Sequence, residues 1–292
     1  MTYRQWSLIV FLGALWGASF LFMRISVPEV GPLFTGAMRV VFAGVFLGML
    51  ALAVGQAGHW ENKKKMAFFS LMNSAIPFSL FSFAANYLPA GYLSVLNATA
   101  PMLGLLIGIF FYKVKHSLKM WVGICFGMFG VISLTALGPI HIGMWQLLSL
   151  LAGVIGAFCY ALTGYWAASW FPKISPMKMT FQNQVMASCW LLPLAGASGL
   201  PTEVSTTSWG ALFGLGVICT GFAYFLYNRL IREIGAVKTS SIAFLIPCFA
   251  IGWSWLFLNE QITQGHVLGV VCIILAVRWT QPSSTCLVKT TC

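Results

Sequence analysis

Aspartate is missing from this chain of 292 residues, and glutamate occurs only five times. All charged residues together make up 7% of the sequence, whereas an ordinary soluble domain contains about 25%. Hydrophobic residues account for 59%. A soluble fold of this length has to cover its surface with polar groups. The composition therefore excludes a water-soluble protein and predicts an integral membrane protein.

Motifs for metals, nucleotides and catalysis are also missing. The eight cysteines form no CxxC pair and no cysteine–histidine metal spacing, and the sequence contains no P-loop, no GxGxxG and no HExxH. We therefore expect no metal, no cofactor and no catalytic residue. A membrane-embedded enzyme and a non-transporting membrane scaffold remain the alternatives to a carrier. A carrier differs from both because it moves a labelled metabolite without converting it.

Ten apolar segments are long enough to cross a bilayer. A transmembrane helix needs about 20 mostly apolar residues, because the hydrocarbon core is about 30 Å thick. Lipid offers no partner for a free backbone N–H, and the alternation typical of barrel strands is absent, so each segment must be a helix. The sequence thus predicts an all-α integral membrane protein with ten transmembrane helices, near residues 6–25, 32–54, 66–87, 90–111, 119–137, 145–169, 177–197, 209–230, 239–258 and 264–280.

The basic residues are distributed unevenly between the two sides of these spans. With the N-terminus inside, fourteen of the sixteen lysines and arginines fall on the inner side: Arg4, Lys63, Lys64, Lys65, Lys113, Lys115, Lys119, Lys173, Lys178, Arg229, Arg232, Lys238, Arg278 and Lys289. The outer connections contain none. By the positive-inside rule, we expect a multi-pass protein of the inner (plasma) membrane with both termini cytoplasmic. Because these loops account for the net charge of +11, we expect no nucleic-acid partner.

An internal repeat appears when the chain is slid by 146 residues. The shift aligns Ala90 with Ala236, Ser94 with Ser240, Pro101 with Pro247, Phe111 with Phe257, Gly123 with Gly269 and Val131 with Val277. Nearer the N-terminus the offset drifts, and Gly13, Ala14 and Pro32 align with Gly156, Ala157 and Pro176. We therefore divide a single membrane transporter domain, residues 1–292, into repeats 1–137 and 138–292, the second with a short cytoplasmic tail. Five spans per repeat is an odd number, so the repeats must be inverted, which is typical of transporters.

Several short motifs resemble the drug/metabolite transporter superfamily, and in particular its EamA-type ten-helix members. They are Leu15-Trp16-Gly17-Ala18-Ser19-Phe20, Arg39, Asn97-Ala98-Thr99-Ala100-Pro101, Ile246-Pro247, Leu258-Asn259-Glu260 and the stretch from Gly265 to Gly269. The resemblance covers essentially the whole chain. It implies a carrier that exports amino acids and related metabolites. It also implies a substrate cavity between helices one to four and six to nine, with helices five and ten outside. The first repeat departs from the family pattern in its closing segment. The acidic residue expected there is replaced, because Val114 aligns with Glu260.

Arg39 is the foremost candidate for substrate contact. It lies about seven residues into the second span, where a guanidinium costs several kcal/mol unless it faces water or a partner. It could bind a substrate carboxylate in a bidentate pair, or it could extend to the outer interface. The other candidates, for which interhelical hydrogen bonding and aromatic packing are the alternatives, are Trp16, Ser19, Asn73, Asn97, Tyr160, Thr163, Gln182, Asn183 and Tyr224.

Three prolines, Pro77, Pro101 and Pro247, lie inside spans, where each removes a backbone donor. They are candidate hinges for alternating access, with static kinks as the alternative.

No carboxylate or histidine lies near the middle of a span, although ion-coupled carriers usually place one there. We therefore expect a carrier driven by the gradient of its small-molecule substrate. Glu260 is the one candidate residue for coupling transport to an ion gradient instead. As a separate expectation, the carrier is a monomer in the lipid bilayer.

Overall fold

The computed structural model describes residues 2–56, 58, 60, 62–112, 118–137, 143–234, 239 and 242–280. In these residues the regular structure is entirely helical. The helices are α1 (Tyr3–Val30), α2 (Pro32–Ala53), α3 (Lys63–Ser70), η1 (Leu71–Ala75), α4 (Ile76–Ala85), α5 (Ala90–Asn97), α6 (Ala100–Tyr112), α7 (Leu118–Leu137), α8 (Met144–Trp170), α9 (Pro176–Ala197), α10 (Thr206–Phe213), η2 (Gly214–Phe222), α11 (Ala223–Ile234), α13 (Ile242–Leu258) and α14 (Gln264–Thr280). Val114, Lys113, Lys115, Lys238, Lys289, Ala236 and Ser240, which the sequence analysis uses, lie outside the described residues.

These helices follow the predicted spans closely. Continuous helical stretches long and apolar enough to cross a membrane are Tyr3–Val30, Pro32–Ala53, Lys63–Ala85, Ala90–Tyr112, Met144–Trp170 and Thr206–Ile234, and shorter apolar helices cover Trp121–Gly130 and Leu245–Leu258. The prediction of an all-α membrane protein is confirmed. The first helix is longer than the predicted segment, because the Thr2 side chain caps its start. It ends where Gly31 adopts φ +79, a conformation that favours glycine, just before Pro32 opens α2.

The contacts between helices repeat from one half of the chain to the other. In the first pair of matching contacts, α1 packs against α13, and its counterpart α8 packs against α5 and α6. In the second pair, α2 packs against η2 in the third span of the other repeat, and α9 packs against η1. The helices α2 and α9 also pack against each other, as do α7 and α14. An inverted repeat with an approximate two-fold axis produces this reciprocity.

Two π-helical segments lie at equivalent places in this repeat. The segment η1 spans residues 71–75 of the third span, and a shift of 146 residues places it on 217–221, inside η2 of the eighth span. A π-helical turn is wider than an α-helical turn because it contains an additional residue. The backbone there departs from the regular hydrogen-bond pattern of the α-helix. Such segments are frequent at functional sites. Both segments lie in the middle of the molecule, which makes this region a candidate for the functional site.

The candidate hinge prolines occupy different settings. Pro101 follows a break in the helix at Ala98 and Thr99, between α5 and α6, whereas its aligned partner Pro247 lies inside the unbroken helix α13. Pro77 lies in the first turn of α4, directly after η1. Hinge motion at these positions stays a prediction.

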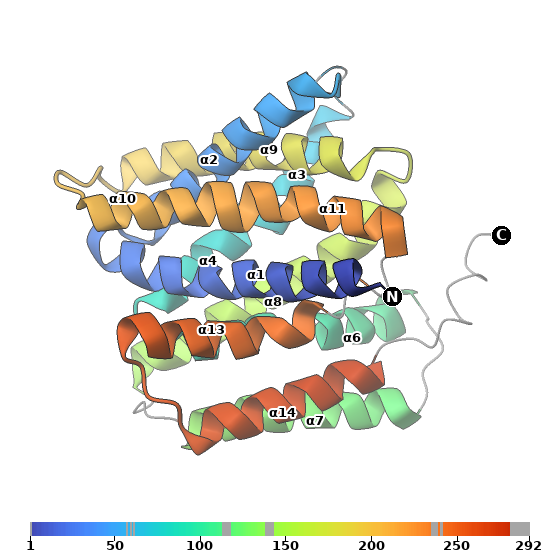
Figure 1. Ribbon diagram of the computed structural model, residues 1–292, viewed down its shortest axis with the longest axis vertical. Coiled ribbons are helices and arrows are strands. Elements are labelled where there is room, and N and C mark those ends of the chain that lie inside the picture. Colours follow the sequence, from blue (N-terminus) through green and yellow to red (C-terminus); the bar gives the residue numbers. More distant parts are fainter. Residues whose placement is uncertain are drawn as a thin grey trace.

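Figure 1 shows α7 and α14 side by side at one edge of the molecule, with the other helices stacked beyond them. We call the end where α1 begins and α11 and α14 finish the basic end, because the described residues Arg4, Lys63, Lys64, Lys65, Arg229 and Arg232 lie there. The other end, where α1 and α13 finish and α14 begins, is the Glu260 end. The core lies between these ends, where both repeats contribute side chains.

Candidate functional site

A central cavity of about 280 Å³ lies between the two repeats. Its lining residues are Trp16, Ser19, Phe20, Met23, Arg39, Asn73, Phe78, Phe81, Asn97, Tyr160, Tyr224 and Ile246. They come from α1, α2, η1, α4, α5, α8, α11 and α13, so no single span builds the site. The volume is close to the lower end of the range for small-molecule sites.

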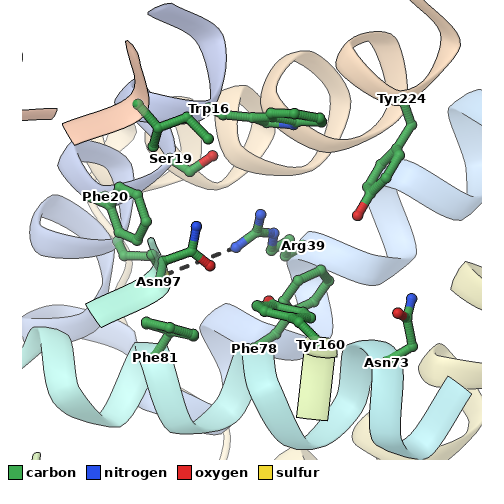
Figure 2. Close-up of a pocket in the computed structure, with 12 residues that line it drawn as sticks. Trp16, Ser19, Phe20, Arg39, Asn73, Phe78, Phe81, Asn97, Tyr160 and Tyr224 are labelled. Atoms are coloured by element: carbon green, nitrogen blue, oxygen red, sulfur yellow. Dashed lines mark hydrogen bonds between the residues drawn. The ribbon is translucent and has the colours of Figure 1, made fainter. Parts of the chain in front are cut away.

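Arg39 extends into this cavity from α2. Its side chain is buried, and its Nε donates a hydrogen bond of 3.0 Å to Oγ1 of Thr220, in η2. Its Cζ lies 3.9 Å from the centroid of the Phe78 ring, a cation–π geometry. One Nη lies 4.0 Å from Sδ of Met23. Figure 2 shows the guanidinium between Trp16 on one side and Phe78 on the other, directed into the cavity. Among the described residues, no carboxylate pairs with it.

Aromatic rings form most of the cavity wall. The Tyr160 ring stacks on Phe81 with 6.1 Å between centroids and 12° between planes. Trp16 meets Tyr224 edge to face at 5.9 Å and Tyr227 at 5.1 Å. Figure 2 places the amides of Asn73 and Asn97 on different sides of the cavity. The wall therefore offers broad apolar faces with a few neutral polar groups and one cation.

A second cavity of about 330 Å³ continues the site toward the basic end. It shares Asn73, Tyr160 and Tyr224 with the central cavity and reaches Pro176 at the start of α9 and Ile231 near the end of α11. We call it the vestibule; its other lining residues are Phe69, Thr163, Gly164, Ala167, Met179, Thr180, Asn183, Tyr227 and Asn228. None of the described side chains that line the vestibule is charged. Together the cavities lead from the middle of the molecule to the basic end.

Hydrogen bonds between side chains hold the polar residues of the vestibule. Thr163 Oγ1 donates to Asn73 Oδ1 at 2.9 Å. Asn183 Nδ2 donates to Ser74 Oγ at 2.8 Å. The Asn183 side chain is buried. Asn183 Oδ1 is thus a buried acceptor without a hydrogen-bond partner among the described residues.

The structure brings most of the sequence candidates together. Trp16, Ser19, Arg39, Asn73, Asn97, Tyr160 and Tyr224 line the central cavity, and Thr163 and Asn183 line the vestibule. Gln182 is fully buried in α9 and lines neither. Five apolar residues that are not among the sequence candidates also line the central cavity: Phe20, Met23, Phe78, Phe81 and Ile246. In a chain that is 59% hydrophobic, nothing in the sequence distinguishes these apolar residues from packing residues.

Charged groups tie the helices together at the Glu260 end. Arg24 Nε lies 3.2 Å from Oε1 of Glu260, and one Arg24 Nη donates to the carbonyl oxygen of Ala85 at 2.8 Å. The other Glu260 oxygen accepts from the backbone N–H of Ala90 at 3.1 Å. This pair joins α1, the end of α4, the start of α5 and the connection after α13. It lies beyond the central cavity on the side opposite the vestibule, where it joins the first repeat to the second.

A second carboxylate joins the two repeats at the same end. Glu29 accepts hydrogen bonds from the backbone and hydroxyl of Ser205 and from the hydroxyl of Ser208, at the start of α10. A carboxylate at a helix N-terminus interacts favourably with the helix dipole. The end of α1 is thereby fixed to α10 in the other repeat.

Comparison with known proteins extends this picture. The model of the EamA-like transporter family matches twice, over residues 4–136 and 147–280. The uncharacterized transporter YoaV of Bacillus subtilis is 23% identical over 91% of this chain and 92% of its own. A WAT1-related chloroplastic protein of Arabidopsis thaliana is 22% identical over 94% of this chain and 69% of its own. A crystal structure with 16% identity shares the fold, with a TM-score of 0.67 over 93% of this chain and 94% of that one.

Proposed function

This chain belongs to the EamA-like transporter family, and from that membership we propose that it exports small metabolites, such as amino acids or related compounds, by alternating access. The observation that carries the proposal is the path formed by the central cavity and the vestibule, which leads to the basic end. The Arg24–Glu260 pair joins the repeats at the opposite end, and we infer that this end is the closed one. A carrier needs a site reached from one side while the other side is closed. In inverted-repeat carriers, that site lies near the midplane between the repeats.

The proposed driving force is the gradient of the substrate itself. The described residues that line the central cavity and the vestibule include no carboxylate and no histidine. Proton or sodium coupling usually uses such a group at membrane depth. Glu260 is occupied at the closed end by Arg24 and the Ala90 N–H, which supports a role in holding the helices.

The proposed setting is the inner (plasma) membrane, where the protein works as a monomer with both termini cytoplasmic. The even number of spans in the family pattern and the basic residues at one end support this orientation. The vestibule then faces the cytoplasm, so a metabolite made in the cell enters without crossing the closed end.

The test is reconstitution of the purified protein in liposomes loaded with a labelled metabolite mixture, combined with a screen for compounds that accumulate outside expressing cells. Efflux of an unconverted compound, saturable and absent from protein-free liposomes, is the expected result. Concentrative uptake driven only by an imposed proton or sodium gradient would contradict the proposed driving force. Conversion of the compound would point to an enzyme instead.

A further inference from the structure

Arg39 has a structural counterpart in the second repeat. The alignment of Pro32 with Pro176 places Arg39 on Asn183, and the shift of 146 residues places Ser74 on Thr220. The hydrogen bonds obey the same correspondence, because Arg39 Nε donates to Thr220 Oγ1 at 3.0 Å and Asn183 Nδ2 donates to Ser74 Oγ at 2.8 Å. Each bond joins the second span of one repeat to the π-helical segment of the other. The two bonds are equivalent parts of one inverted design.

This correspondence provides an internal control for the role of Arg39. The second repeat makes the interhelical bond with a neutral amide, so the bond does not require a positive charge. Asn183 is 3% exposed and Arg39 is 9% exposed, so both side chains are buried. A buried guanidinium without a carboxylate partner is unfavourable, whereas a buried amide with a hydrogen bond is not. The charge of Arg39 therefore needs an explanation beyond the link between helices.

The rest of the site does not neutralise this charge. Among the described residues that line the central cavity and the vestibule, Arg39 is the one that is charged. Three glutamates are bound elsewhere, Glu29 at the start of α10, Glu233 beside Arg229, and Glu260 beside Arg24. The contacts that Arg39 makes are to a hydroxyl, a sulfur and a ring face. An anion bound in the cavity would supply the missing partner.

The same set of lining residues is poorly suited to bind an ammonium group of the substrate. An ammonium in the cavity would meet amide oxygens and aromatic faces, with no carboxylate among the lining residues. Such neutral acceptors compensate for the water that the ammonium group loses on binding less well than an ionised partner does. The rings of Phe81, Tyr160 and Trp16 instead suit an apolar body attached to the anionic group.

We propose that the substrate is a small organic monoanion with an apolar or aromatic body, bound through Arg39, and that a substrate ammonium adds no affinity. The inference rests on the proposed carrier function and narrows its substrate class from amino acids and related compounds to monocarboxylates and similar anions.

The test compares compounds that share an apolar body and differ in whether they carry a carboxylate, an ammonium group or both. One series is 3-phenylpropionate, phenylalanine and 2-phenylethylamine, and a second is 4-methylpentanoate, leucine and 3-methylbutylamine. Binding to the purified protein is measured by thermal shift and transport by counterflow in liposomes. We expect the anion of a series to bind about tenfold more tightly than the zwitterion, which must desolvate an ammonium without an ionised partner, and the amine not to bind.

Preference for the zwitterion or the amine would overturn the inference while leaving the carrier function intact. A neutral or cationic compound identified by the export screen as the substrate would overturn it equally. If no compound of either series, and none of the metabolite mixture, is moved, the carrier function itself fails.

Variants separate the charge of Arg39 from its hydrogen bond. Arg39→Asn installs the residue of the second repeat, so we expect a similar melting temperature but loss of the preference for the anion. Arg39→Lys should keep the preference with weaker binding, because the charge remains without the planar guanidinium. Thr220→Val removes the acceptor and leaves the charge, so the preference should remain. If Thr220→Val lost it as completely as Arg39→Asn, Arg39 would serve only to link the helices, and the inference would be wrong.

Discussion

Glu260→Gln should loosen the closed end of the molecule. The Glu260 carboxylate joins α1 to the start of α5 through Arg24 at 3.2 Å and the Ala90 N–H at 3.1 Å. Glutamine keeps one acceptor oxygen but removes the negative charge. Arg24 then retains its bond to the Ala85 carbonyl but loses its ionised partner.

The size of the effect follows from the exposure of the pair. The Arg24 and Glu260 side chains are 28% and 16% exposed, between a solvent-exposed pair and a buried one. Exposed ion pairs contribute about 0–1 kcal/mol, and hydrogen bonds to charged groups contribute about 1.5–3 kcal/mol. We therefore expect the substitution to destabilise the closed arrangement by about 1–2 kcal/mol, which raises the fraction of molecules open at this end roughly 5–30-fold.

The assay is modification of a single cysteine in the central cavity, Ser19→Cys, in a protein that lacks the eight native cysteines. A membrane-impermeant thiol reagent added from the Glu260 side should react about 5–30-fold faster after Glu260→Gln. Glu203→Gln makes the same chemical change at an exposed residue of the same end and should leave the rate unchanged. An unchanged rate in Glu260→Gln, or an equal increase from both sides, would refute the assignment of this pair as the closure.

Three further outcomes follow from the packing and the charge distribution. Gln184→Met should raise the free energy of unfolding by about 1–2 kcal/mol, because neither amide atom of the fully buried Gln184 has a hydrogen-bond partner among the described residues; a lower melting temperature in detergent would contradict this. Gly216→Ala should lower stability by about 1–3 kcal/mol in the same assay, because a Cβ there would lie 2.5 Å from Cβ of Phe42, whereas Gly210→Ala, with nothing within 4 Å, should have little effect. A cysteine replacing Lys64 should react with impermeant reagents only after the cytoplasmic face is exposed, and labelling on intact cells would reverse the proposed orientation.

Much of the fold could be predicted from the sequence because its determinants are local. Lipid forces each long apolar segment into a helix whatever its neighbours are, so the spans needed no tertiary information. The repeat was also readable, because glycines and prolines such as Pro101 and Pro247 recur at a fixed spacing. The structure extended that repeat to the aligned π-helical segments, which hydropathy does not reveal because a π-helical turn needs no distinctive composition.

The partners of the charged residues were decided only by tertiary structure. Arg39 meets Thr220 across 181 positions, and Arg24 meets Glu260 across 236. No local pattern specifies contacts at such separations. The run from Gln182 to Gln184 illustrates the same limit on a smaller scale. Successive residues on a helix point about 100° apart, so three adjacent amides cannot share one face. Only packing against the other repeat directs Asn183 to the vestibule and leaves its two neighbours buried elsewhere.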